Sequence, residues 1–132
     1  MKLKINLNQD ISYDHFEEII VSALEGGSNY WYLLKTSEFK AKLEGDSNEP
    51  LTTRIARTLY NDPTFEMKVY DVEEDDGEPE LGIVSQATML EGIKIAAEKY
   101  AFAYHDLMEG QGDGGTADVL FQLATMGEII YG

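Results

Sequence analysis

The sequence predicts a single α+β domain, in which about four helices pack on a small, mostly antiparallel sheet of three or four strands. The chain has 132 residues, of which 43% are hydrophobic, and this is enough for one core in one domain. Four segments repeat apolar residues at the spacing of a helix, and others alternate apolar with polar residues as strands do. Residues 1–132 contain no repeat and no low-complexity linker, so we expect one domain throughout.

The N-terminal elements are expected to be a strand and a helix. Apolar and polar residues alternate over 3–8, which is typical of a strand. Ser12 is placed to cap the helix that follows. The apolar stripe of that helix comprises Phe16, Ile19, Ile20, Ala23 and Leu24. We expect Gly26 and Gly27 to end the helix, because glycine adopts the left-handed C-terminal position without a Cβ clash.

The next segments are expected to include a strand or helical turn, a loop and a helix. Residues 30–34 form a short apolar run that fits either a buried strand or a helical turn. Residues 36–50 are polar and are expected to be mostly loop. A second helix is expected over 52–60, and the Asn-Asp-Pro sequence at 61–63 ends it.

An acidic hairpin is expected in the middle of the chain. Residues 65–70 and 81–85 predict two paired strands, and seven of the ten residues at 71–80 are acidic. These carboxylates repel one another, so the hairpin tip should be solvated. The run does not fit an EF-hand calcium loop, because Asp76 stands at the glycine position and Gly82 at the glutamate position.

Two further helices are expected in the C-terminal part. A threonine–glutamate capping box predicts a long helix over 88–108. A glycine-rich loop follows, and Thr116 is expected to cap the last helix. Asp118 would lie in the first turn of that helix, where the helix dipole favours a negative charge. Residues 128–132 would either add a strand or extend the last helix.

The charge of the chain limits its partners. The formal net charge is −15, which argues against direct binding of nucleic acid and of an anionic membrane surface. Residues 1–66 carry 11 acidic and 7 basic residues, whereas residues 67–132 carry 14 acidic and 3 basic residues. The acidic second half of the chain therefore either keeps the protein in solution or binds a basic partner protein.

No catalytic, metal or cofactor site is predicted. The chain has no cysteine, and its two histidines, His15 and His105, do not have the spacing of a metal-ligand pair. No serine stands in a nucleophile elbow. An enzyme that uses Glu25 or Asp118 as an acid–base group is kept as an alternative.

The two arginines form a possible anion clamp. Arg54 and Arg57 are three residues apart, which places both on one helix face. They either pair with carboxylates of the same chain or hold the phosphates of a nucleotide-like ligand. In the second case Tyr30 or Trp31 could stack on the base.

The only tryptophan stands between two tyrosines, and this aromatic run follows the double glycine after Ser28 and Asn29. This block is either a corner of the core or a shelf for a ligand. Buried tryptophan and tyrosine need hydrogen-bond partners for their N–H and O–H groups. If the last helix packs here, the candidate members of the site are Ser28, Asn29, Tyr30, Trp31, Asp118 and Gln122.

Three segments resemble a family of small phage and prophage proteins. Residues 23–32 read A-L-E-G-G-S-N-Y-W-Y, and residues 116–132 read T-A-D-V-L-F-Q-L-A-T-M-G-E-I-I-Y-G. The segment E-G-I-K-I-A-A-E-K-Y at 91–100 fits the same pattern. The resemblance implies a bacterial virus or an integrated element as the source, and an accessory role such as host takeover or counter-defence. It brings no established activity and no catalytic residues.

We therefore expect a phage-type accessory protein that acts by binding, with a basic host protein as its partner. The alternative is a binder of a small nucleotide-like ligand. No signal peptide is visible and the longest apolar run is far shorter than the roughly 20 residues that span a bilayer, so the cytoplasm of the bacterial host is expected. A homodimer is also expected, since symmetric pairs are common.

Overall fold

The computed structural model describes residues 2–4, 10–73 and 80–132, and in this part of the chain it confirms the α+β fold. In chain order the elements are β1 (Lys2–Lys4), β2 (Asp10–Ser12), α1 (Tyr13–Ser22), the π-helical turn η1 (Ala23–Gly27), β3 (Tyr32–Leu33), the 3₁₀ turns η2 (Thr36–Glu38) and η3 (Lys40–Lys42), α2 (Leu51–Asn61), β4 (Glu66–Asp71), β5 (Glu80–Ser85), α3 (Gln86–Lys99), α4 (Ala101–Glu109) and α5 (Gly114–Met126). The predicted strand 3–8 coincides with β1 only at residues 3 and 4, and its residues 5–8 lie outside the described part.

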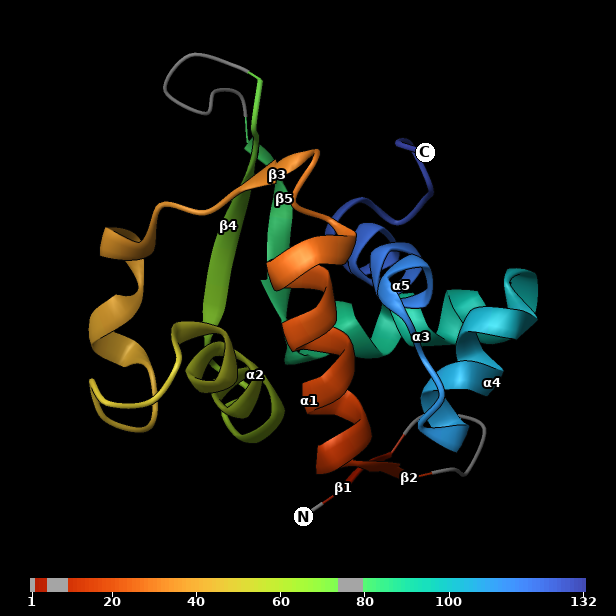
Figure 1. The fold of residues 1–132 in the computed structure, drawn as a ribbon, viewed down its shortest axis with the longest axis horizontal. Coiled ribbons are helices and arrows are strands. Elements are labelled where there is room, and N and C mark those ends of the chain that lie inside the picture. Colours follow the sequence, from red (N-terminus) through yellow and green to blue (C-terminus); the bar gives the residue numbers. More distant parts are fainter. Residues whose placement is uncertain (1, 5–9, 74–79) are drawn as a thin grey trace.

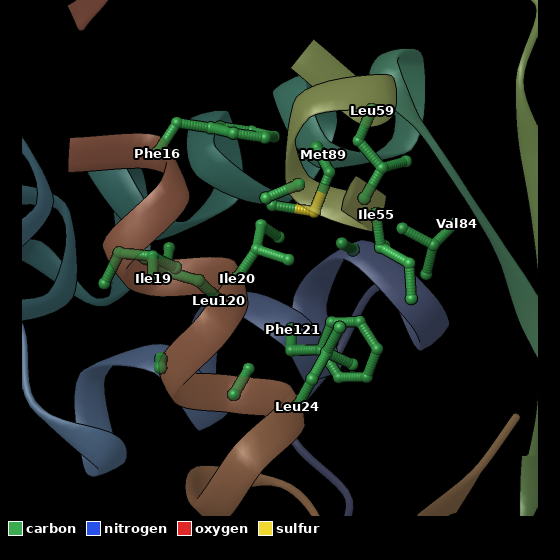
Figure 2. Packing of buried hydrophobic residues seen from close by; sticks show 14 of the residues in the cluster. Phe16, Ile19, Ile20, Leu24, Ile55, Leu59, Val84, Met89, Leu120 and Phe121 are labelled. Atoms are coloured by element: carbon green, nitrogen blue, oxygen red, sulfur yellow. The ribbon is translucent and has the colours of Figure 1, made fainter. Parts of the chain in front are cut away.

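The last helix, α5, lies at the centre of the molecule. It contacts α1, α3, α4, β5 and η1, and Figure 1 shows α1 and α5 between the three-stranded sheet and α4. Side chains from α1, α2, α3, α5 and β5 meet in one core (Figure 2). Among the most buried members are Phe16, Ile20, Ile55, Leu59, Met89 and Phe121, each at most 1% exposed. Helix α5 therefore links the helices to the sheet.

The predicted hairpin is confirmed. Strands β4 and β5 pair antiparallel, and β3 joins the free side of β4, which gives the sheet order β3-β4-β5. The apolar run at 30–34 thus supplies a short strand. Strands β1 and β2 form a separate antiparallel pair. Of the predicted acidic tip at 71–80, residues 74–79 lie outside the described part.

Two helices begin before the predicted residues. The Ser12 cap of α1 is confirmed, since its hydroxyl accepts the His15 N–H at 3.2 Å. Helix α3, however, is capped by a box of Ser85 and Thr88, not by Thr88 and Glu91. Helix α5 is capped by Asp113, whose Oδ1 accepts the backbone N–H of Thr116 at 2.9 Å. The prediction that Thr116 caps this helix and that Asp118 lies in its first turn is therefore wrong.

The predicted helix over 88–108 is two helices. The chain breaks at Tyr100, where φ is −135° and ψ is 60°, and α4 turns back so that it contacts α1, α3 and α5. Apolar residues continue at helical spacing on both sides of the break. The pattern therefore shows two buried faces but does not show the change of direction between them.

The double glycine has a different role from the predicted one. The π turn η1 contains both glycines and ends at Gly27, so the predicted end of the helix is confirmed, but neither Gly26 nor Gly27 has the predicted positive φ. A Cβ atom on Gly27 would lie 2.4 Å from the carbonyl oxygen of Gly114, whereas a Cβ on Gly26 would meet nothing within 4 Å. Gly27 is thus required for the close approach of η1 to the start of α5.

Residues 128–132 form neither of the two predicted elements. The segment is irregular, and the side chain of Gln122 binds it. Gln122 Oε1 accepts the backbone N–H groups of Ile130 and Tyr131, both at 2.9 Å, and Gln122 Nε2 donates to the Tyr131 carbonyl at 3.0 Å. A side-chain amide that satisfies the backbone in this way replaces the ladder of a strand. Within the described ranges, no helix has the length and apolarity required to cross a membrane.

Candidate functional site

One carboxylate gathers most of the predicted site residues. Asp118 Oδ1 accepts hydrogen bonds from Ser28 Oγ at 2.8 Å and from Trp31 Nε1 at 2.7 Å. Asp118 Oδ2 accepts from Tyr30 Oη at 2.6 Å and from Gln122 Nε2 at 3.1 Å. We call these five residues the Asp118 cluster. It joins the turn after η1 to α5, as the sequence predicted for a packed last helix.

The two neighbouring aromatic residues of the cluster differ in burial. Trp31 is 1% exposed, its ring stacks on Tyr131 with centroids 5.3 Å apart, and it packs against Phe121. The core interpretation is therefore confirmed for Trp31. Tyr30 is 49% exposed, although its hydroxyl reaches Asp118. Only Tyr30 of this pair offers a ring to a partner.

Asn29 lies apart from the cluster. Its side chain is exposed, and among the described contacts it forms no hydrogen bond with Asp118 or its donors. It lines a separate cavity of about 280 Å³, which is mostly apolar. The other residues of that cavity come from η1, β3, the residue after β3, η2 and α2, and include Leu24, Leu34, Leu51 and Ile55.

The arginine pair is bound by the protein itself. Arg57 forms a bidentate ion pair with Glu49, and Arg54 Nε donates to the carbonyl of Glu44 at 3.0 Å. These contacts hold the pKa of the Glu49 carboxyl at about 2, mainly through the Arg57 hydrogen bonds. The cavity that Arg57 lines is bordered by Tyr13, Tyr60 and Asn61, and neither Tyr30 nor Trp31 belongs to it.

Three exposed apolar side chains belong to the cluster or to residues whose backbone is bonded to it. Tyr30 is one of them, and the others are Val72, 38% exposed, and Ile130, 56% exposed. The Val72 N–H donates to the Trp31 carbonyl at 3.0 Å, and the Ile130 N–H donates to Gln122 Oε1. The backbone of each residue is therefore bonded to a member of the cluster. We call Tyr30, Val72 and Ile130 the apolar surface. Sequence reasoning did not identify Val72 or Ile130, because apolar residues in short runs carry no sign of which side faces water.

Carboxylates border the apolar surface. Asp71 and Glu73 flank Val72 in the chain, and Glu128 stands two residues before Ile130. Asp71 Oδ2 accepts a hydrogen bond from Tyr131 Oη at 3.4 Å, which places this carboxylate near the segment that carries Ile130. A surface that is apolar at its centre and acidic at its edge suits a partner with apolar and basic side chains.

The tyrosines provide a pH-dependent signature of the fold. Burial and a hydrogen bond to a carboxylate raise the pKa of Tyr30 and of Tyr13 to about 12, and burial does the same for Tyr32. The folded protein thus keeps protons that the unfolded chain releases near pH 10. We expect stability to be complete below pH 10 and to fall as the pH rises toward 12.

An ultraviolet titration of tyrosinate measures this behaviour. At least three phenols should ionise late, and Tyr30→Phe should remove one of them without changing the early phase. Ionisation of every tyrosine near pH 10 in the folded protein would contradict the expectation.

The Asp118 cluster is a site for hydrogen bonding rather than for proton transfer. Both carboxylate oxygens accept two hydrogen bonds each, so a reacting group has no open position on them. In the described ranges, no group of three or more His, Asp or Glu side chains is arranged to hold a metal ion.

Comparisons with protein-family models, with curated proteins and with solved structures gave no match for this chain.

Proposed function

We propose that the protein acts by binding a basic partner protein through the apolar surface of Tyr30, Val72 and Ile130. The observation that carries this proposal is that three exposed apolar side chains belong to the Asp118 cluster or to residues hydrogen-bonded to it, with carboxylates close to them in the chain. The apolar centre supplies affinity by leaving water. The carboxylates steer a basic partner toward it.

Charge favours a basic partner over a second copy of the chain. Two copies with a net charge of −15 each repel one another, most strongly where acidic edges would meet. The resemblance to phage and prophage proteins supports an accessory role in a bacterial host, such as host takeover or counter-defence. The proposal does not use the arginine pair, since its contacts are with the protein's own groups.

Replacement of Ile130 by serine is expected to weaken this binding. Ile130 contributes an exposed side chain, while its backbone N–H contact to Gln122 is kept in the variant. Loss of its apolar contact should cost about 1–2 kcal/mol, or roughly 5- to 30-fold in the dissociation constant. The measurement is capture from bacterial lysate, followed by titration of the identified partner in purified form.

Phe102→Ser is the matched control, because Phe102 is also 56% exposed but lies on α4. It should leave the affinity unchanged. Binding should also weaken as the salt concentration rises, since screening shortens the reach of the carboxylates to about 3 Å at 1 M. A partner that tolerates high salt, or that loses affinity equally with both variants, would contradict the proposal. So would self-association that Ile130→Ser abolishes.

A further inference from the structure

A charged cavity lies beside β4, away from α5. Its volume is about 300 Å³, at the lower end of the range for small-molecule sites. It lies between the segment of η2 and η3 and strands β4 and β5, and Figure 1 shows that segment beside β4, away from α5. The side chains that matter for recognition are those of Glu38, Phe39, Lys42, Glu66, Lys68 and Ile83.

The wall of the cavity is fixed by contacts to the sheet. Phe39 is buried, and its ring packs edge-on against Phe65 with centroids 5.9 Å apart. Tyr70 Oη donates to both oxygens of Glu38, at 3.0 and 2.9 Å. The 3₁₀ segment therefore keeps its place over the strands, and the carboxylate of Glu38 is oriented before any ligand arrives.

The strands supply the opposite wall. Lys68 of β4 pairs with Ile83 of β5 in the sheet register, so the two side chains lie on the same face. Glu66 stands two residues before Lys68 and shares that face. Ile83 is 38% exposed, which leaves apolar surface available in the cavity.

The positive and negative side chains around this cavity are equal in number, and its lysines form no salt bridge with a described residue. Two lysines and two glutamates line it, in a chain that has 10 basic and 25 acidic residues. Among the described residues, no salt bridge within 4.0 Å joins Lys42 or Lys68 to a carboxylate. An anion would be opposed by Glu38, Glu66 and the net charge of the whole chain. A simple cation would be opposed by the lysines. A neutral ligand that carries both charges meets neither obstacle.

We propose that this cavity binds a small zwitterion with an apolar side group, of the size of an α-amino acid such as leucine. The ligand carboxylate would lie between Lys42 and Lys68, and its ammonium group would face Glu38 and Glu66. The apolar side group would contact Ile83. This site is distinct from the apolar surface and does not depend on the proposed protein partner.

The test is a titration of the full chain, followed by NMR, with three ligands of one carbon skeleton. L-Leucine carries both charges, leucinamide lacks the carboxylate and 4-methylpentanoate lacks the ammonium group. We expect saturable shifts at the cavity residues with L-leucine, and affinity at least about tenfold weaker for each of the other two.

Lys68→Gln should weaken leucine binding about tenfold, because it removes a charged donor from an exposed position in β4. Lys94→Gln on α3 is the control and should bind as the parent chain does. Absence of saturable shifts at millimolar leucine would overturn the proposal, as would equal affinity for 4-methylpentanoate or an equal loss in both variants. Ile130→Ser should leave leucine binding unchanged, so the two binding proposals can fail separately.

Discussion

Asp118→Ala is expected to be among the most destabilising single substitutions in this protein. The change leaves Ser28 Oγ and Trp31 Nε1 without their acceptor, and both residues are at most 1% exposed. We expect a loss of about 3–5 kcal/mol in the free energy of unfolding, since each buried donor without an acceptor costs about 1–3 kcal/mol. Urea denaturation followed by circular dichroism measures the loss.

Two further variants serve as controls for this result. Asp118→Asn keeps one acceptor oxygen and should lose only about 1–2 kcal/mol. Glu98→Ala removes an exposed carboxylate from α3 and should change stability by less than about 0.5 kcal/mol. A loss below 1 kcal/mol in Asp118→Ala would mean that water satisfies the orphaned donors, and the cluster would then not hold the turn after η1 on α5.

The second large effect separates two neighbouring glycines. Gly27→Ala should lower the free energy of unfolding by about 2–3 kcal/mol or more, because the new Cβ would meet the backbone of α5 and force two segments apart. Gly26→Ala should raise it by up to about 1 kcal/mol, since its Cβ meets nothing within 4 Å and alanine restricts the unfolded chain.

Thermal denaturation of the two variants side by side gives the answer in one experiment. Changes of the same sign and size would show that flexibility of the double glycine, rather than contact with Gly114, is what matters at this position.

The sequence predicted the elements that local patterns determine. Helices α1 and α2 and the β4–β5 hairpin follow from apolar period and from turn residues, and the structure agrees within one or two residues at most ends. The start of α5 was missed because glycine has low helix propensity, so the loop was extended through Gly114 and Gly115. In the structure, packing of Gly114 against Gly27 and the cap by Asp113 outweigh that propensity.

The grouping of the candidate residues was predicted in part. The hydrogen bond from Trp31 to Asp118 could be expected, because a buried indole needs an acceptor and the last helix offered few. The sequence could not show that Tyr30 is exposed while Trp31 is buried, since a turn decides which side of the chain each ring occupies. The charged cavity was not foreseen either, because its lysines and glutamates come from segments about 30 residues apart.

The Asp118 cluster also has a consequence for the route by which the chain folds. Its bonds join residues 87–90 positions apart, so they close about two thirds of the chain into one loop. The β4–β5 hairpin and the α1–α2 pair can form much earlier, since their contacts span shorter loops. During synthesis from the N-terminus, the Trp31 ring therefore stays unburied until α5 has been made and packs against it. An unfinished chain presents that ring to any chaperone it meets.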